Sequence, residues 1–352
     1  MKTTEKRLVE EADKALRRCL EQVPSLAIKR VQKGARPGTI SPDLALKLKT
    51  SDAEQAVVVE VRSSGQPRVV REAVNQLLQY RSKNPEVYGV LVAPYLSPQS
   101  AEVCAENGIG YVDLAGNCRL RFRQVYVERK GRPNPAPQRR NLRSLYSPRA
   151  TRVLRVLLLD PKKTWKLQPL AQESGVSLGQ VFNVKKMLAD REWIRSSEEG
   201  LRLVEPTPLL AEWSENYSYR RNTPRDFYSL DLPGDVETKL AGACRDAGIT
   251  YALTGFSAAA RLAPAVRYQR VTAYVQDDIN DIAQRLGLKE VTSGANVTLL
   301  SPYDEGVFYG VSGVNGVEIV SAVQAYLDLV GYRGRGEEAA TFLLEQVIQR
   351  RW

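Results

Sequence analysis

The fold of this chain is decided by residues 56–80, AVVVEVRSSGQPRVVREAVNQLLQY. The apolar, β-branched run at residues 56–62 has the composition of a buried strand. A polar turn at residues 63–67 then separates this strand from a helix. Because alternate residues of a strand share one side, we expect Glu60 and Arg62 to lie on the same face.

The helix after the turn carries two more polar side chains. It should begin near Val69, and it places Gln76 and Tyr80 four residues apart, one turn above the other. Upstream, Asp43 opens an alternating segment at residues 43–49, which we expect to be a strand. The sequence therefore predicts a strand, strand, helix arrangement with polar side chains on each element.

These residues resemble the motifs of the PD-(D/E)xK nuclease fold, most closely its RecB-like branch. A Pro-Asp pair ending at Asp43 is followed by the strand with Glu60 and Arg62, and then by a Gln-x-x-x-Tyr helix. The resemblance implies a restriction-endonuclease-like α/β domain in which Asp43 and Glu60 hold Mg²⁺ or Mn²⁺ if the site is active. It makes the following side chains the candidate catalytic residues: Asp43, Glu60, Arg62, Gln76 and Tyr80.

The third motif position departs from the family pattern. Active members carry a lysine there, which orients or deprotonates water, whereas this chain has Arg62. A guanidinium binds phosphate but stays protonated at ordinary pH. The resemblance therefore predicts the fold better than it predicts cleavage. A nuclease-like domain kept for DNA contact or scaffolding is the alternative.

Composition indicates a basic protein of two or three domains. The chain has 352 residues, with 51 Lys and Arg against 40 Asp and Glu, a net charge of +11. Such a charge favours an anionic partner, and double-stranded DNA is the first candidate. No apolar run approaches the roughly 18 residues that a membrane helix needs, and the N-terminus has the pattern of a charged helix rather than a signal peptide. We expect a cytoplasmic, nucleoid-associated prokaryotic protein without a membrane partner.

The chain contains no histidine. This excludes histidine general bases, Ser-His and Cys-His nucleophile pairs, and metal sites with histidine ligands. Four cysteines are far apart in the sequence and form no C-x-x-C pair, which predicts reduced thiols rather than a zinc site or disulfides. They are Cys19, Cys104, Cys118 and Cys244.

A basic segment follows the first domain. Residues 129–155 contain no Asp or Glu, and prolines interrupt their first half. Basic segments of this kind bind the phosphate backbone, and a solvated linker is the alternative. The candidate phosphate-binding residues are Arg139, Arg140, Arg143, Arg149 and Arg152.

Residues 148–205 have the pattern of a winged helix-turn-helix. A helix at 147–160 and a short helix at 167–176 precede a third helix at 177–192, for which Ser177 is the expected N-cap. The third helix would enter the major groove, and we expect Val181, Phe182 and Leu188 to pack inward. The remaining DNA-binding candidates lie on this helix and beside the polar turn SSEEG: Ser177, Gln180, Asn183, Lys186, Arg195 and Arg202. A winged helix used for protein contact is the alternative.

Residues 206–225 read as a connector, and residues 226–352 as a third domain. Its strand, Gly-Phe-Ser turn and helix at 250–264 outline a nucleotidyltransferase-like α+β fold. Active members carry two carboxylates in the next strand, where this chain has Thr272-Ala273-Tyr274. Asp277 and Asp278 come later. We expect this domain to be catalytically inactive. The predicted domains are therefore 1–128 (nuclease-like), 129–147 (basic linker), 148–205 (winged helix), 206–225 (connector) and 226–352 (degenerate nucleotidyltransferase-like).

Residues 148–352 together resemble the AbiEi-type antitoxins of type IV toxin–antitoxin systems. The resemblance rests on YALTGFSAAARLAP, GANVTLLSPYDEGVFY and the tail VSAVQAYLDL…GRGEEAA. It implies a DNA-binding autorepressor that counters a nucleotidyltransferase-like toxin without stably binding it. The nuclease-like domain in front departs from that pattern.

The function expected from the sequence is that of a DNA-binding regulator, an antitoxin-like transcriptional repressor. A cognate toxin or a second copy of the chain is a candidate partner besides DNA. The alternative is a Mg²⁺-dependent DNA endonuclease aimed by the winged helix, in phage defence or in a mobile element.

Overall fold

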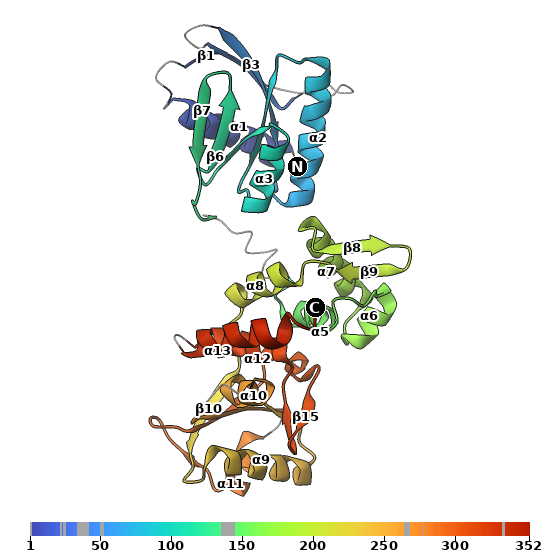
Figure 1. Ribbon diagram of the computed structural model, residues 1–352, viewed down its shortest axis with the longest axis vertical. Coiled ribbons are helices and arrows are strands. Elements are labelled where there is room, and N and C mark those ends of the chain that lie inside the picture. The colour runs from blue at the N-terminus through green and yellow to red at the C-terminus, as the bar shows by residue number, and fades with distance from the viewer. Residues whose placement is uncertain are drawn as a thin grey trace. The chain divides into compact units, whose positions relative to one another are not determined.

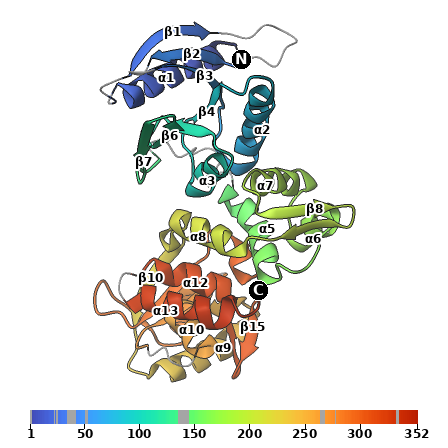
Figure 2. The same ribbon diagram turned by 45° about the horizontal axis from the view of Figure 1, so that its top comes forward.

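The computed structural model describes residues 2–21, 23, 26–33, 42–49, 53–134, 145–263, 268–276, 278–332 and 335–352. The chain divides into two compact units, Met1–Gln138 with Ala189–Glu192 and Arg139–Leu188 with Trp193–Trp352. Figures 1 and 2 show the elements of each unit. Both units are mixtures of helices and sheets, which confirms the α/β multidomain class expected from the sequence. None of the helices in the described ranges is both long and apolar enough to cross a membrane.

The first unit is built on a seven-stranded sheet whose strands follow chain order, β1 to β7. Strands β3, β4 and β5 are parallel, and the other neighbours are antiparallel. The strands are β1 (Ala27–Lys33), β2 (Leu44–Lys49), β3 (Glu54–Val61), β4 (Tyr88–Ala93), β5 (Gly110–Asp113), β6 (Cys118–Phe122) and β7 (Val125–Arg129). The helices are α1 (Lys2–Leu20), α2 (Pro67–Lys83) and α3 (Pro98–Glu106).

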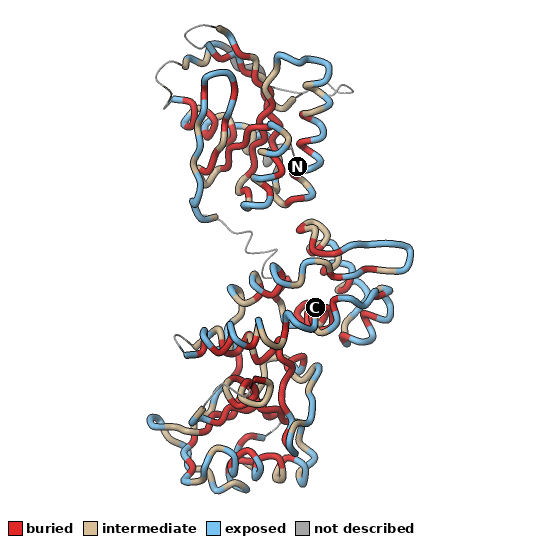
Figure 3. Tube along the Cα trace, in the orientation of Figure 1, coloured by how far each residue is buried: buried red, intermediate tan, exposed pale blue. Residues whose placement is uncertain are grey.

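Strand β3 is buried on both faces, which explains its nearly continuous apolar sequence. Val57 and Val59 point into a core that α1 covers, whereas Val58 points into a second core shared with α2 and α3. Figure 3 shows that buried residues concentrate in the strands of both sheets. The alternation of side chains along β3 therefore places helices on both sides of the sheet.

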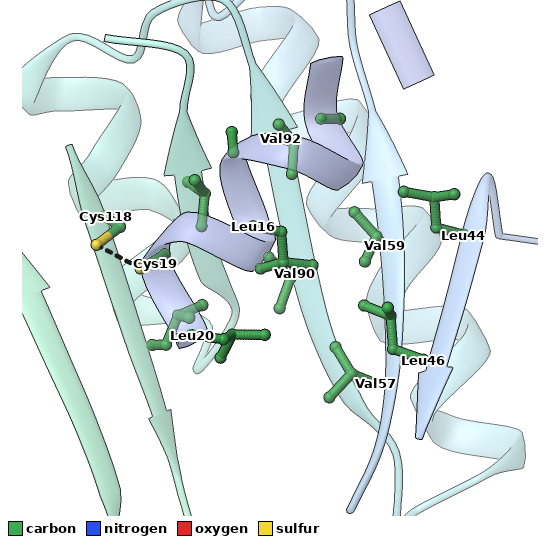
Figure 4. Packing of buried hydrophobic residues seen from close by; sticks show 14 of the residues in the cluster. Leu16, Cys19, Leu20, Leu44, Leu46, Val57, Val59, Val90, Val92 and Cys118 are labelled. Carbon is green, nitrogen blue, oxygen red and sulfur yellow. Dashed lines mark hydrogen bonds between the residues drawn. The ribbon is translucent and has the colours of Figure 1, made fainter. Parts of the chain in front are cut away.

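The core under α1 brings two distant cysteines together. Leu16 and Leu20 of α1 pack near Val90, and Cys19 lies 2.8 Å from Cys118, sulfur to sulfur (Figure 4). All four cysteines are buried free thiols, as expected from their spacing. The proximity of Cys19 and Cys118 could not be predicted, because 99 residues separate them.

The second unit begins with three helices and a hairpin. These are α5 (Pro148–Leu159), α6 (Leu167–Glu173), α7 (Leu178–Asp190), β8 (Ile194–Ser197) and β9 (Gly200–Leu203). Gly175, with φ +60°, makes the turn between α6 and α7. The backbone of Trp165 exchanges two hydrogen bonds of 2.8 Å with Leu201, which fastens the segment before α6 to the hairpin.

One expectation about α7 is wrong. Val181 and Leu188 are fully buried as expected, but the Phe182 side chain is 57% exposed. The reason is helical spacing: Val181, Val184 and Leu188 recur every three or four residues and define the buried side. Phe182 lies outside that stripe.

The second sheet also has seven strands, in the order β13-β10-β14-β12-β11-β16-β15. Strand β12 is parallel to β14, and β11 is parallel to β16. Its strands are β10 (Thr223–Tyr228), β11 (Tyr251–Leu253), β12 (Val271–Val275), β13 (Lys289–Glu290), β14 (Val297–Ser301), β15 (Ser312–Val314) and β16 (Val317–Ile319).

Helices cover both faces of this second sheet. Helices α10, α12 and α13 lie on one side, and α9 and α11 lie on the other (Figure 1). The remaining elements are α8 (Pro206–Asn216), η1 (Tyr219–Arg221), α9 (Pro233–Ala247), α10 (Gly255–Leu262), α11 (Ile279–Arg285), η2 (Glu305–Phe308), α12 (Ala322–Val330), α13 (Arg335–Leu343) and η3 (Leu344–Ile348).

Candidate functional site

Strands β2 and β3 bring the two candidate carboxylates together. The antiparallel register pairs Leu44 with Val59, so Asp43, one residue before β2, comes opposite Glu60. The Val61 amide donates a hydrogen bond of 2.7 Å to Asp43 Oδ2. The sheet register thus fixes the position of Asp43 relative to β3.

Arg62 closes this pair of carboxylates. Its Nη1 donates to Glu60 Oε2 at 2.7 Å and lies 3.7 Å from Asp43 Oδ2. Its Nη2 donates to the side-chain oxygen of Gln76 on α2. Four of the five predicted catalytic residues therefore form one cluster, which we call the carboxylate cluster. Tyr80, one turn further along α2, packs against the apolar core shared with α3.

Burial dominates the electrostatics of this cluster. It raises the pKa of the Glu60 carboxyl, the Arg62 guanidinium opposes that rise, and the negative charge of Asp43 adds to it. The Arg62 side chain is only 23% exposed. The guanidinium is thus the counter-charge that allows Glu60 to be ionised in a nearly buried position.

The donor set of the carboxylate cluster does not fit a resident divalent ion. Mg²⁺ and Mn²⁺ need carboxylate oxygens that can coordinate them directly. Here Arg62 binds Glu60 Oε2 and lies against Asp43 Oδ2, which also accepts the Val61 amide. Elsewhere in the described residues, no group of three or more His, Cys, Asp or Glu side chains is placed to hold a metal. We therefore derive no step through a metal ion.

The outward side of α7 is the second candidate site. Opposite its buried stripe, the helix exposes Gly179, Phe182, Asn183 and Lys186, while Gln180 is half-buried at the edge. We call these four exposed residues the α7 face. Ser177 Oγ accepts a hydrogen bond of 3.2 Å from the Gln180 amide and caps the helix, as its sequence position predicts.

The hairpin beside α7 presents two arginines to solvent. Arg195 and Arg202 stand directly opposite each other across β8 and β9, and both are exposed. Neither makes an ion pair with a carboxylate of the described residues. Like charges directly opposite on a sheet are unfavourable. This arginine pair is therefore suited to an anion supplied from outside the chain.

The candidate arginines before α7 have different surroundings. Arg149 is exposed near the start of α5. Arg152 instead binds Asp304 through three hydrogen bonds of 2.9, 3.1 and 2.8 Å and Glu305 through one of 2.6 Å. The hydrogen bond with Asp304 raises the pKa of Arg152. These internal bonds leave Arg149 as the better candidate for phosphate. Arg139, Arg140 and Arg143 lie outside the described residues.

A buried polar network fastens α5 to the second sheet. Arg155 Nη2 donates to Gln324 Oε1 at 2.6 Å, and Gln324 Nε2 donates to Asp328 Oδ1 at 3.1 Å. The hydroxyls of Tyr217 and Tyr274 donate to the same aspartate at 2.5 and 3.0 Å. Burial raises the pKa of Asp328, whereas these donors lower it. Sequence reasoning missed the network; its only signal was a Gln and an Asp four residues apart on an otherwise apolar helix.

The second sheet carries no pair of carboxylates at the expected nucleotidyltransferase position within the described residues. Thr272 and Tyr274 lie in β12 and are buried, and Tyr274 belongs to the network around Asp328. Asp278 caps α11 by accepting the Asn280 amide at 2.8 Å. Asp277 lies outside the described residues. The acid that can be placed thus has a structural role.

Residues 202–349 match the protein family described as "Transcriptional regulator, AbiEi antitoxin, Type IV TA system". The match begins in β9 and ends just after η3, so it covers the second sheet with its helices. The expected resemblance to AbiEi antitoxins is thereby confirmed over these residues.

Two solved structures are similar to part of the chain. "Structure of EndoMS in apo form" has 19% identity and a TM-score of 0.22, over 29% of this chain and 45% of that one. "Structure of EndoMS-dsDNA2 complex" has 18% identity and a TM-score of 0.21, over 29% of this chain and 44% of that one. The chain thus spans less than half the length of these structures. No curated protein matches the sequence.

Proposed function

We propose that this protein is a DNA-binding transcriptional regulator of the antitoxin type. In this proposal residues 148–205 form a winged helix-turn-helix, α7 is its recognition helix, and β8 and β9 are its wing. The order of three helices and a hairpin supports it, as does the family match at residues 202–349. A cognate toxin or a second copy of the chain is a further partner in the proposal, and the site of action is the nucleoid.

The observation that carries the proposal is the pair formed by Arg195 and Arg202. Two exposed guanidinium groups face each other without a carboxylate partner in the described residues. Phosphate groups of DNA supply the missing negative charge, and each such contact releases condensed counterions. Arg149 lines a hollow together with Ser177 and Leu178 at the start of α7, where the helix N-terminus adds positive potential.

The other two regions are proposed to be enzyme folds without their chemistry. Residues 1–128 would be a restriction-endonuclease-like domain in which Arg62 neutralises the carboxylates that an active enzyme gives to a metal. Residues 226–352 would be a nucleotidyltransferase-like domain whose acidic pair is missing. Neither region would cut or transfer nucleotides; the first would hold DNA or act as a scaffold.

The proposal is tested by the salt dependence of DNA binding. We would measure binding of the full chain to a short duplex between 50 and 200 mM salt, with the double variant Arg195→Ala/Arg202→Ala. The slope of log K against log salt should fall by about two, since each lost phosphate contact removes about 0.9. The control is Arg245→Ala/Lys289→Ala, two exposed cations of α9 and β13, which should keep the slope.

Two results would contradict the proposal. Absence of duplex binding would remove the DNA-binding function, and equal slopes for the two double variants would remove the role of the wing. Adding Mg²⁺ or Mn²⁺ to the same samples tests the nuclease alternative. Nicking that is lost in Glu60→Ala would establish the endonuclease instead.

A further inference from the structure

The α7 face contains two residues that the chain itself does not explain. Phe182 exposes 57% of its surface, although burial of an aromatic ring is strongly favourable. Gly179 lies in the first turn of the helix, where glycine is less favourable than alanine. A Cβ built on Gly179 would meet nothing closer than Ser177 Oγ at 4.0 Å, so internal packing does not require a glycine there.

Both residues are explained by a surface that approaches the helix closely and offers an apolar group. Glycine permits close approach of a backbone to a ligand. The major groove of DNA presents one apolar group, the C5-methyl of thymine, and phenylalanine is one of the side chains that contact it. Asn183 stands next to Phe182 and can pair bidentately with adenine. Neighbouring side chains thus suit the two bases of an A·T pair.

The charges around the α7 face favour DNA over a protein partner. Lys186 continues the face one turn beyond Phe182, and its exposed residues include no acid. The hollow before α7 is lined by two arginines, by polar and apolar side chains, and by Glu305. That glutamate pairs with Arg152 at 2.6 Å, and Arg152 also pairs with Asp304 at 2.8 Å. An apolar ring beside an exposed lysine, on a face without acids, matches a base edge flanked by phosphates.

Resting on the proposed DNA-binding function, we infer that Gly179 and Phe182 form a thymine-reading surface. The Phe182 ring packs on the C5-methyl group of a thymine, and Gly179 lets the first turn of α7 approach the base edges. Asn183 reads the adenine side of the same or the adjacent base pair. The protein therefore prefers sites in which thymine occupies defined positions.

The test removes one methyl group at a time. A preferred duplex is first enriched from a random pool with the full-length protein, and each thymine in it is then replaced by uracil, which lacks only the methyl. The wild type should lose about fourfold in affinity at one or two positions, the value of one buried methyl group. Phe182→Ala should bind the thymine and uracil duplexes equally. Phe342→Ala is the control, because Phe342 on α13 is also exposed, by 38%.

A glycine pair tests the close approach separately. Gly179→Ala should weaken binding to the enriched duplex by about tenfold, the loss expected for one base contact, while its unfolding temperature stays equal or rises. Gly242→Ala is the matched control. Gly242 lies in α9 and a Cβ there would also meet open space, so this change should leave binding unaltered.

Each outcome has one meaning. No duplex binding by the wild type would overturn the proposed function itself. Binding that is insensitive to uracil at every position, with Phe182→Ala behaving as the wild type, would overturn the thymine reader while DNA binding stands. If Phe182→Ala instead abolished self-association and kept its DNA affinity, the ring would belong to a protein interface, and the inference would also be overturned.

Discussion

The carboxylate cluster and the β8–β9 hairpin use the same side chain in opposite ways. In the cluster, the Arg62 guanidinium donates hydrogen bonds to Glu60, at 2.7 Å, and to Gln76. On the hairpin, Arg195 and Arg202 face each other and make no ion pair within the described residues. The first arrangement contributes to folding and leaves little for a ligand; the second does little for folding and is open to an anion.

The comparison teaches that a basic residue in a basic protein is not a DNA contact by virtue of its charge. Arg152 illustrates this, since it sits in a segment without acids yet binds Asp304 and Glu305 more than 150 residues away. The surroundings within about 4 Å decide the role of such a residue, because a short-range ion pair dominates over more distant charges.

The largest expected effect on stability is in the carboxylate cluster, where the arginine is already bound within the chain. Arg62→Ala should lower the free energy of unfolding by about 2 kcal/mol, because it leaves the nearly buried Glu60 without its counter-charge. Chemical denaturation measures the change. The control is Arg68→Ala, whose exposed pair with Glu72 at 3.4 Å should contribute about 0.5 kcal/mol or less. Equal losses of unfolding free energy in the two variants would mean that Arg62 does not act as the counter-charge of Glu60.

The next effect concerns divalent ions. Mg²⁺ should not shift the unfolding transition of the wild type, because Arg62 already neutralises the carboxylates. In Arg62→Ala the freed Asp43 and Glu60 can coordinate the ion, which should stabilise the variant by about 1.4 kcal/mol at an ion concentration about tenfold above its Kd. Adding Glu60→Gln to that variant should abolish the gain. Stabilisation of the wild type by the same amount would show that a metal fits beside Arg62.

A smaller effect is expected in the pH dependence of stability. The pKa of Glu60 is raised by burial, so the native state holds a proton that the unfolded chain has already lost. Its contribution is therefore present in full below the ordinary pKa of glutamate and is lost as the pH rises through the raised value. The difference in unfolding free energy between wild type and Glu60→Gln should grow as the pH is lowered from about 7 to about 4.5.

Glu54 provides a control of opposite sign. Lys29, at 2.7 Å, lowers the pKa of Glu54, so its contribution is present above the ordinary pKa and is lost as the pH falls. Glu54→Gln should therefore differ most from the wild type at neutral pH. Identical pH profiles for the two variants would contradict the assigned burial of Glu60.

The smallest effect on stability is expected for the exposed arginine pair of the β8–β9 hairpin. Arg195→Glu should raise the free energy of unfolding by about 0.5 kcal/mol, because it turns a cross-strand repulsion with Arg202 into an attraction. The same change should weaken DNA binding, so stability and affinity should move in opposite directions. A loss of stability would show that Arg195 already has a partner in the folded chain.

Much of the fold was predictable because it rests on local pattern. The apolar run of β3 and the turn before α2 were visible in residues 56–80, although α2 begins at Pro67 rather than near Val69. Proline suits the first position of a helix because its missing amide donor is not needed there. The cap at Ser177 was predictable for a similarly local reason.

The arrangement of the sites was less predictable, since it depends on pairing and packing direction. Four of the five candidate residues of the nuclease-like domain lie together. Their proximity depends on the register of β2 and β3, which cannot be read from the sequence. The exposure of Phe182 had a readable signal, because Val181, Val184 and Leu188 already complete a buried stripe.

By itself, the sequence determined the α/β class, the buried strand and the resemblance of the C-terminal part to antitoxin regulators, because periodicity and composition act over a few residues. Only the tertiary structure decided that Arg62 lies against two carboxylates and that Arg152 bonds to Asp304. It also decided that Arg195 and Arg202 have no carboxylate partner within the described residues. The physical reason is that charge interactions depend on distances of a few ångströms between residues far apart in the chain. Those distances exist only once the sheets are paired and the helices are packed.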